Sequence, residues 1–367
     1  MKRRSLGIGL ILLSLIFFAL AGLSHGGLVP PPAAVPVPPS TAPMPEETLA
    51  PSTAPTPAPT PVPTPTPTPS PSPHPLQEPQ LTEDRISPDF FEPAAEQGTL
   101  LTDVSYTTPD YVFGMEGEFP KVMQVYLPFG YDENGQYDVL FLFHVRQSPV
   151  SFWLDMEHEY NLPGLGIRQV KSLPMLDNLI ERGLAKPMII VALWGYLDSY
   201  ASDRHLSEQN YPQMAGEFGD VIVPFVVEHF ATYAEGSSRE QIRAAREHFG
   251  VLGASFGAFM VDLSILSENL DLVAWYGMAG GGSVTRAYLE PIWLQKGFLE
   301  YPLRLLYFVE GEYDDIGPVA SSYQALGLWS EKFTPEENLR FTMLRETGHV
   351  DQAWLTALFN TAQLFFR

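Results

Sequence analysis

Apolar positions beyond residue 120 fall into short runs and into stretches with helical spacing. Seven runs are typical of strands, and the uninterrupted ones indicate strands that are buried on both faces of a sheet. They cover residues 121–128, 138–145, 186–195, 248–253, 271–280, 303–311 and 339–346. Helical spacing marks residues 172–183, 220–234 and 351–366. This alternation predicts an α/β fold, with a mostly parallel central sheet and helices on both faces.

The N-terminus has the pattern of an export signal. Lys2-Arg3-Arg4 is followed by an apolar run over 6–18 and by a small-x-small site at Ala19-Leu20-Ala21. We therefore expect residues 1–21 to be a signal peptide and the protein to be secreted or held at the cell surface. The alternative is an uncleaved anchor, because residues 6–23 carry no charge and approach the minimum length of a membrane span. Membrane contact is expected only in that case.

A proline- and threonine-rich segment, residues 29–79, separates the signal from the rest of the chain. It holds more than half of the 36 prolines. Proline lacks the amide hydrogen and fixes φ, which predicts an extended spacer with a reach of about 150 Å. The folded domain is expected over residues 87–367.

Charge and cysteine content exclude several classes of function. The formal net charge is −22, from 43 acidic and 21 basic residues. A nucleic-acid-binding protein needs a basic surface, so no nucleic-acid partner is expected. The chain has no cysteine, which excludes disulfides and thiolate metal sites.

One serine has the context of a nucleophile. Gly253-Ala254-Ser255-Phe256-Gly257 has the form G-x-S-x-G, between a predicted strand and an apolar helical face. Such a turn strains the serine backbone and exposes its hydroxyl, while the Phe256 amide points toward the same side. The alternative is a small residue in a tight bend.

A serine nucleophile needs a histidine base and a carboxylate that orients the histidine. In this architecture the acid and then the histidine follow the serine. His349 is the only histidine after Ser255, and it follows a predicted strand. Asp314 is the predicted acid and Asp315 the second choice, while Glu312 more simply caps its strand.

These stretches carry a resemblance to a known family. The segments are "VYLPFGYDENGQYDVLFLFH", "MLDNLIERGLAKPMIIVA", "GASFGA", "EGEYDD" and "ETGHVDQAW", which lie within residues 122–354. They resemble α/β-hydrolase esterases of the feruloyl and acetylxylan type (carbohydrate esterase family 1, esterase D-like). The resemblance implies that Ser255 is the nucleophile, Asp314 the acid and His349 the base.

The sequence departs from that family after the "LFLFH" strand. Glycines usually follow the histidine, whereas this chain continues Val145-Arg146-Gln147-Ser148 after His144. Those glycines let an amide approach the substrate carbonyl, and Val145 resists the positive φ that glycine accepts. By the resemblance, Arg146 N–H takes the position of the second oxyanion donor beside Phe256; the alternatives are a reshaped loop or the Arg146 side chain as the donor. Losing one donor costs about 10²- to 10³-fold in rate. His144 is interpreted as a structural histidine.

Other features extend the hypothesis to the substrate pocket. Trp153, Trp194 and Trp354 lie near predicted rim loops and could stack on a sugar or an aromatic acyl group, or belong to the core. The polar insertion 195–219 and the loop after residues 275–283 are candidate pocket walls. The other histidines lack metal-ligand spacing, so no metal or cofactor is implied.

The resulting hypothesis is a secreted serine ester hydrolase that acts through an acyl-enzyme on a small-molecule or polysaccharide ester, with feruloyl or acetyl groups of cell-wall polysaccharide as the substrate class. Two alternatives stay open. One is an acyltransferase or peptidase with the same triad, and the other is a non-catalytic surface-binding protein on the same scaffold.

Overall fold

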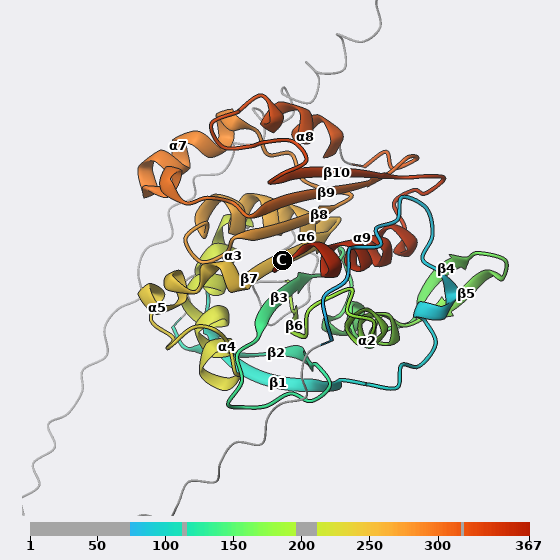
Figure 1. The fold of residues 1–367 in the computed structure, drawn as a ribbon. Helices are drawn as coiled ribbons and strands as arrows, with labels where there is room; N and C mark the ends of the chain where they lie inside the picture. The colour runs from blue at the N-terminus through green and yellow to red at the C-terminus, as the bar shows by residue number, and fades with distance from the viewer. Residues whose placement is uncertain (1–73, 112–115, 196–210, 317–318) are drawn as a thin grey trace, which may run out of the picture. The chain divides into compact units, whose positions relative to one another are not determined.

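The computed structural model describes residues 74–111, 116–195, 211–316 and 319–367 (Figure 1). They belong to one compact unit, Pro65–Arg367. The predicted signal peptide and the predicted linker up to residue 73 lie outside the described residues. Within the described ranges, every helix is too short or too polar to cross a membrane.

An eight-stranded sheet forms the centre, in the order β1-β2-β6-β3-β7-β8-β9-β10. The six strands from β6 to β10 in this order run parallel, whereas β2 is antiparallel to both β1 and β6. Their bounds are β1 Thr99–Pro109, β2 Glu118–Leu127, β3 Asp138–Phe143, β6 Met188–Leu193, β7 Phe249–Ala254, β8 Trp275–Ala279, β9 Leu305–Gly311 and β10 Leu339–Leu344. All seven predicted strands are present.

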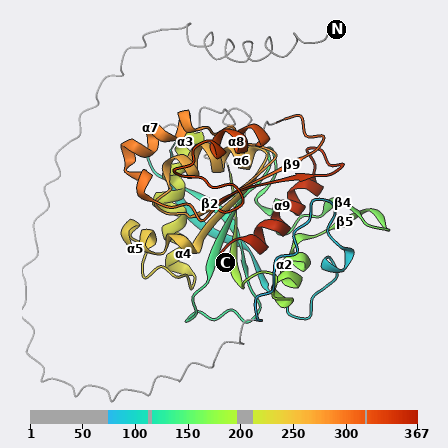
Figure 2. The same cartoon turned by 45° about the horizontal axis from the view of Figure 1, so that its top comes forward.

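Helices cover both faces of this sheet. One face carries α2 (Ser172–Glu181), α9 (Asp351–Leu364) and a hairpin of β4 (His158–Leu162) and β5 (Gly166–Val170). The other carries α3 (Tyr211–Glu217), α4 (Val223–His229), α5 (Arg239–Ala244), α6 (Phe256–Met260), α7 (Arg286–Lys296) and α8 (Val319–Gly327). Figure 2 shows α2 and α9 on the opposite side from α4, α5 and α7. The predicted α/β-hydrolase arrangement is confirmed.

Strand β3 is apolar without interruption from Val139 to Phe143, because helices cover both of its faces. Val139, Phe141 and Phe143 belong to the core under α3 to α8, whereas Leu140 and Leu142 belong to the core under α2 and α9. All five side chains are fully buried. A parallel strand with helices on both faces has no solvent side, so polar alternation is absent.

The helix predicted over 220–234 differs from the observed one. The helical run begins earlier, at Tyr211, and ends at His229. A π-helical turn, Phe218–Ile222, lies directly before Val223-Pro224. Proline has no amide hydrogen to donate, and the wider turn lets the helix continue past it. The apolar residues after His229 lie outside the helix and pack against the core.

The folded part begins before the expected Ser87. Gln77 N–H donates to Gly183 O at 2.7 Å, and Gln80 N–H donates to the Gln363 side chain at 2.7 Å. Ile86 is buried, and its N–H donates to the Tyr160 hydroxyl at 2.8 Å. The described end of the predicted linker, residues 74–79, is therefore bound to the domain.

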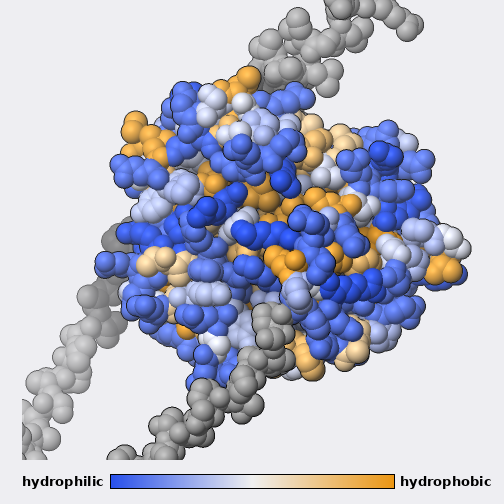
Figure 3. Space-filling model, in the orientation of Figure 1, coloured by the Kyte–Doolittle hydropathy of each residue, from blue (hydrophilic) through white to orange (hydrophobic). Residues whose placement is uncertain are grey.

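The surface of the described residues is mostly hydrophilic. Hydrophilic residues cover most of the face drawn in Figure 3, and apolar residues show between them and at places along the rim. Such a surface is typical of a domain whose apolar residues are used for its cores.

Candidate active site

Ser255 occupies the sharp turn between β7 and α6. Its φ of 51° and ψ of −113° are strained for a residue with a side chain. A Cβ on Gly253 would lie 2.1 Å from Gly257 O, and one on Gly257 would lie 2.2 Å from Phe143 O. The two glycines of the motif therefore let strand, helix and neighbouring strand meet backbone to backbone, which is the context predicted for a nucleophile elbow.

The structure brings Ser255, His349 and Asp314 together from three strand ends. His349 Nε2 lies 2.7 Å from Ser255 Oγ, and His349 Nδ1 lies 2.9 Å from Asp314 Oδ2. The hydroxyl donates to Nε2 when Nδ1–H donates to the carboxylate. This arrangement can remove a proton from the hydroxyl and stabilise the resulting imidazolium.

Of the neighbouring carboxylates, only Asp314 contacts His349 among the described side chains. The Asp314 side chain is fully buried, and its Oδ1 accepts the Ile316 N–H at 3.0 Å. Asp315 is exposed. Glu312 is also exposed, and it accepts the Glu346 N–H at 3.0 Å, so it ties the loop after β9 to the loop that leads to His349.

Trp354 packs against the candidate base. Its ring meets the His349 ring edge to face, with centroids 4.7 Å apart. Trp354 is 3% exposed, and a Cβ on Gly280 would lie 2.5 Å from its ring. The interpretation of Trp354 as a substrate-stacking residue is therefore corrected: the buried indole packs against the His349 imidazole and supports its position.

In the loop after β3, the positive φ that glycine would accept in the related esterases is not at Val145. Gln147 has a φ of 59°, while Val145 and Arg146 keep negative φ. The end of β3 abuts the elbow, because Phe143 O and His144 O are the atoms that a Cβ on Gly257 would meet. The loop of Val145 to Ser148 thus starts within atomic contact of the turn that holds Ser255.

His144 is buried at the start of this loop. Its Nδ1 lies 2.7 Å from Val145 O, and its Nε2 lies 3.1 Å from the Gly195 N–H. Nδ1–H therefore donates to the carbonyl, and Nε2 accepts from the amide. Burial lowers the pKa of His144 to about 4, so the ring is neutral near pH 7. These contacts agree with the structural role predicted for it.

A glycine run after β8 contacts the site on another side, and the sequence interpretation considered only the loop that follows this run, as a pocket wall. A Cβ on Gly281 would lie 2.6 Å from Ser255 O, and one on Gly280 would lie 2.8 Å from Asp314 Oδ2. Asp262, seven residues after Ser255, is fully buried and accepts the Ser283 N–H at 2.6 Å. Burial raises the pKa of Asp262 to about 7. In the sequence, the feature that could have singled out Asp262 is that it is the one charged residue in an apolar helical stretch.

The remaining predicted substrate residues separate. Trp153 is fully buried in the core under α2 and α9, so it offers no face to a substrate, and that assignment is corrected. Trp194 is half-buried at the carboxyl end of β6, next to the Gly195 that binds His144. Of the insertion 195–219, residues 196–210 lie outside the described residues, and the part from Tyr211 is helical.

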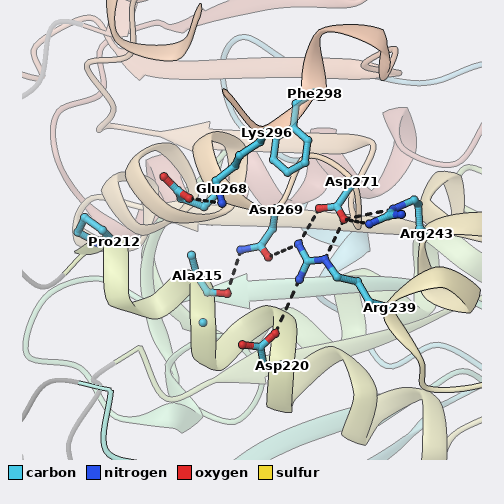
Figure 4. A pocket seen from close by; sticks show the side chains of 11 residues that line it. Pro212, Ala215, Asp220, Arg239, Arg243, Glu268, Asn269, Asp271, Lys296 and Phe298 are labelled. Atoms are coloured by element: carbon cyan, nitrogen blue, oxygen red, sulfur yellow. Dashed lines mark hydrogen bonds and ion pairs between the residues drawn. The ribbon is translucent and has the colours of Figure 1, made fainter. Parts of the chain in front are cut away.

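A polar cavity of about 450 Å³ lies near the amino ends of β7 and β8, opposite the ends that carry Ser255, His349 and Asp314. It lies between α3, α5 and α7 (Figure 4). Its buried Asp271 accepts hydrogen bonds from Arg239 at 2.7 Å and from Arg243 at 2.9 Å. Lys296 pairs with Glu268 at 2.7 Å. These charges pair with one another, so we interpret the cavity as a structural network. Elsewhere in the described residues, too, no group of three or more His, Asp or Glu could hold a metal ion.

Comparisons with known proteins bear on the fold. The feruloyl esterase module of Clostridium thermocellum, solved as a serine-to-alanine mutant with sinapinate, superposes with a TM-score of 0.59 at 19% identity, over 80% of this chain and 96% of that one. A CE1 ferulic acid esterase of Anaeromyces mucronatus gives a TM-score of 0.56 at 21% identity, over 79% and 98%.

The chain has the α/β-hydrolase fold of these feruloyl esterases. The resemblance predicted from the motifs is thus confirmed for the fold of this α/β-hydrolase domain. A curated relative is endo-1,4-beta-xylanase Y of Acetivibrio thermocellus, 29% identical over 193 residues. That match covers 52% of this chain but only 15% of the xylanase. No protein-family model matches the chain.

Proposed function

We propose that this protein is a serine carboxylic-ester hydrolase. The observation that carries the proposal is the continuous hydrogen-bonded series from Ser255 Oγ through His349 to the buried Asp314. It is joined to a strained turn that exposes the serine and to a fold shared with feruloyl esterases. A serine in an ordinary bend would need neither the strain nor the histidine.

The reaction follows from these positions. His349 Nε2 takes the hydroxyl proton while Ser255 Oγ attacks the ester carbonyl, and Asp314 stabilises the imidazolium. His349 then gives the proton to the departing alcohol, which leaves an acyl-enzyme. Water, activated by the same imidazole, attacks the acyl carbon and releases the acid.

The negative charge on the carbonyl oxygen needs two amide donors. Phe256 N–H, at the start of α6, is one of them. Arg146 N–H is the other, and His144 positions it. The Val145 carbonyl and the Arg146 N–H belong to one planar trans peptide and point in opposite directions. Because His144 holds the carbonyl, it also determines where the N–H points. A side-chain hydrogen bond thus takes the role that glycine flexibility has in the family.

The substrate class rests on the similar structures. One of them is solved with sinapinate and another with ferulic acid, at a TM-score of 0.54 for the latter. These names support hydroxycinnamate esters of polysaccharide as the substrate of this chain. An exported enzyme on a proline-rich stalk, as the first 79 residues predict, would meet such a substrate outside the cell.

The test compares the full chain with its Ser255→Ala variant on methyl ferulate and p-nitrophenyl acetate. We expect the variant to lose about 10⁴-fold or more of kcat. A fluorophosphonate probe should label Ser255, as read by peptide mass spectrometry. Equal turnover by both proteins would remove Ser255 from the mechanism. No turnover and no labelling would favour the non-catalytic binding protein, and faster transfer to an added alcohol than to water would favour an acyltransferase.

A further inference from the structure

Three consecutive glycines, residues 280–282, follow β8, the strand that lies between β7 and β9. They therefore pass between the strand that carries the candidate nucleophile and the strand that leads to the candidate acid. All three are buried, and Gly280 and Gly282 have φ of 56° and 112°. Glycine has wide conformational freedom, so this segment keeps one position only where contacts fix it. We call residues 280–283 the glycine strap.

The glycine strap contacts the candidate catalytic residues at several points. A Cβ on Gly281 would lie 2.6 Å from Ser255 O. One on Gly280 would lie 2.8 Å from Asp314 Oδ2 and 2.5 Å from the ring of Trp354, which packs against the candidate base. A displacement of the strap therefore changes the surroundings of the nucleophile, of the acid and of the ring that supports the base.

The two ends of the strap are held in different ways. At its start, the Gly280 N–H donates to Val309 O of β9 at 2.9 Å. At its far end, the Ser283 N–H donates to Asp262 Oδ2 at 2.6 Å, and the Val284 N–H also donates to this carboxyl group. When the carboxyl group is ionised, both hydrogen bonds are charge-assisted, which makes them stronger than bonds between neutral groups.

Asp262 belongs to the same helical run as the turn of the nucleophile. Helix α6 begins directly after Ser255 and continues into a π-helical turn, Val261–Leu266, which contains Asp262. The helix leads from Ser255 to Asp262, and the strap leads from Asp262 back to the Ser255 backbone. The contacts form a closed ring, so a loss of the anchor at Asp262 is felt at the serine.

A carboxyl group destabilises the fold at this place. Asp262 is fully buried, in a turn whose other buried residues include Val261 and Ile265. Its Oδ1 has no hydrogen-bond partner among the described residues. Burial raises the pKa of Asp262 to about 7. A buried polar atom without a partner lowers stability, so stability alone does not account for an aspartate here.

We propose that Asp262 is a positioning residue of the hydrolase: its carboxyl group fixes the glycine strap, and the strap fixes Ser255 relative to Asp314. The inference rests on the proposed esterase function and deepens it. Asp262 is fully buried and cannot contact a substrate. Its removal should therefore lower kcat and leave KM nearly unchanged.

The experiment compares Asp262→Ala and Asp262→Asn with a control, Asp177→Ala. Asp177 is also a buried carboxylate that accepts a backbone N–H, that of Gly98 at 2.9 Å, but it lies in α2, on the other face of the sheet. For methyl ferulate we expect Asp262→Ala to lower kcat about 10- to 10²-fold. Asparagine keeps a neutral acceptor for the two amides, so Asp262→Asn should stay within about fivefold of the wild-type kcat. Asp177→Ala should lower Tm and leave kcat unchanged.

The rate is expressed per active serine, counted by fluorophosphonate labelling, so that unfolded protein does not lower it. Thermal melts show whether each variant folds, and Asp262→Leu replaces Asp262→Ala if the latter does not. A rise in KM as large as the fall in kcat would refute the positioning role. So would equal losses of kcat in Asp262→Ala and Asp177→Ala, because the effect would then be one of general stability.

Amide hydrogen exchange tests the anchor without turnover. We expect the peptide that covers residues 280–284 to exchange faster in Asp262→Ala than in the wild type, and at the wild-type rate in Asp177→Ala. Unchanged exchange would refute the anchor. Faster exchange with a wild-type kcat would refute the positioning role and leave the esterase standing. A wild-type protein that neither turns over methyl ferulate nor is labelled would refute the esterase itself, whatever the exchange shows.

Discussion

The elbow can be tested through Gly257 without touching a reacting group. In Gly257→Ala, the new Cβ would lie 2.2 Å from Phe143 O, 2.6 Å from Phe143 C and 2.8 Å from His144 O. Ordinary contact begins at 3.4 Å, so the first distance is short by 3.4 − 2.2 = 1.2 Å. All three atoms are backbone and cannot rotate away.

The strain has to be relieved by moving α6 away from β3 by about 1 Å, and Ser255 moves with it because it directly precedes this helix. The present Ser255–His349 distance is 2.7 Å. A misplacement of about 1 Å costs about 10²-fold in rate. Overpacking of this kind costs about 1–3 kcal/mol of unfolding free energy. We therefore expect kcat to fall about 10²-fold and Tm to fall by several degrees.

The assay is steady-state hydrolysis of methyl ferulate together with a thermal melt. Gly327→Ala is the matched control, because its Cβ would lie 3.7 Å from Pro335 and 3.8 Å from Leu339 at the end of α8. We expect no loss of rate or stability there. Wild-type kcat and Tm in Gly257→Ala would refute the described packing, and a lower Tm with full kcat would refute the link between this packing and the serine.

Three further predictions concern buried polar groups. Asp314→Asn should lower kcat by about 10⁴-fold, whereas the exposed Asp315 should tolerate Asn; kcat of the two variants decides between these carboxylates. His144→Ala should lower kcat about 10²- to 10³-fold with little change in KM. A rise in KM as large as the fall in kcat would contradict the positioning role. Because the pKa of His144 is about 4, the pH profile of the wild-type rate should show no ionisation of this ring above pH 5. Burial raises the pKa of Asp262 from 3.8 to about 7, so the folded protein binds this proton more tightly than the unfolded chain does. The unfolding free energy should therefore fall as the pH rises from about 4 to 7, and it should level off above pH 7. Asp262→Asn should remove that slope in urea unfolding at pH 5 and pH 8, and an unchanged slope would contradict it.

Several features of the fold and site could be predicted because their signals are local. Strand β3 is apolar at every position from Val139 to Phe143 because both faces of the strand are covered, and this run can be recognised in the sequence alone. The order of serine, acid and histidine limited the base to one residue, His349. The G-x-S-x-G spacing could be recognised because Gly253 and Gly257 contact each other across the turn, which leaves no room for a side chain on Gly253. Strand β1 escaped notice because most of its side chains are exposed at the sheet edge.

Other features depend on contacts between residues far apart in the chain, and only the tertiary structure decided them. Asp314 and Asp315 have the same chemistry, and only the fold determines which of them turns inward to His349. Trp153 has the sequence context of a rim residue, yet it is buried. The left-handed backbone of the loop falls on Gln147, and the nearby His144 binds Val145 in the same loop and Gly195 at the end of β6. Local patterns follow from backbone geometry and burial, whereas the choice among equivalent side chains follows from packing across the sheet.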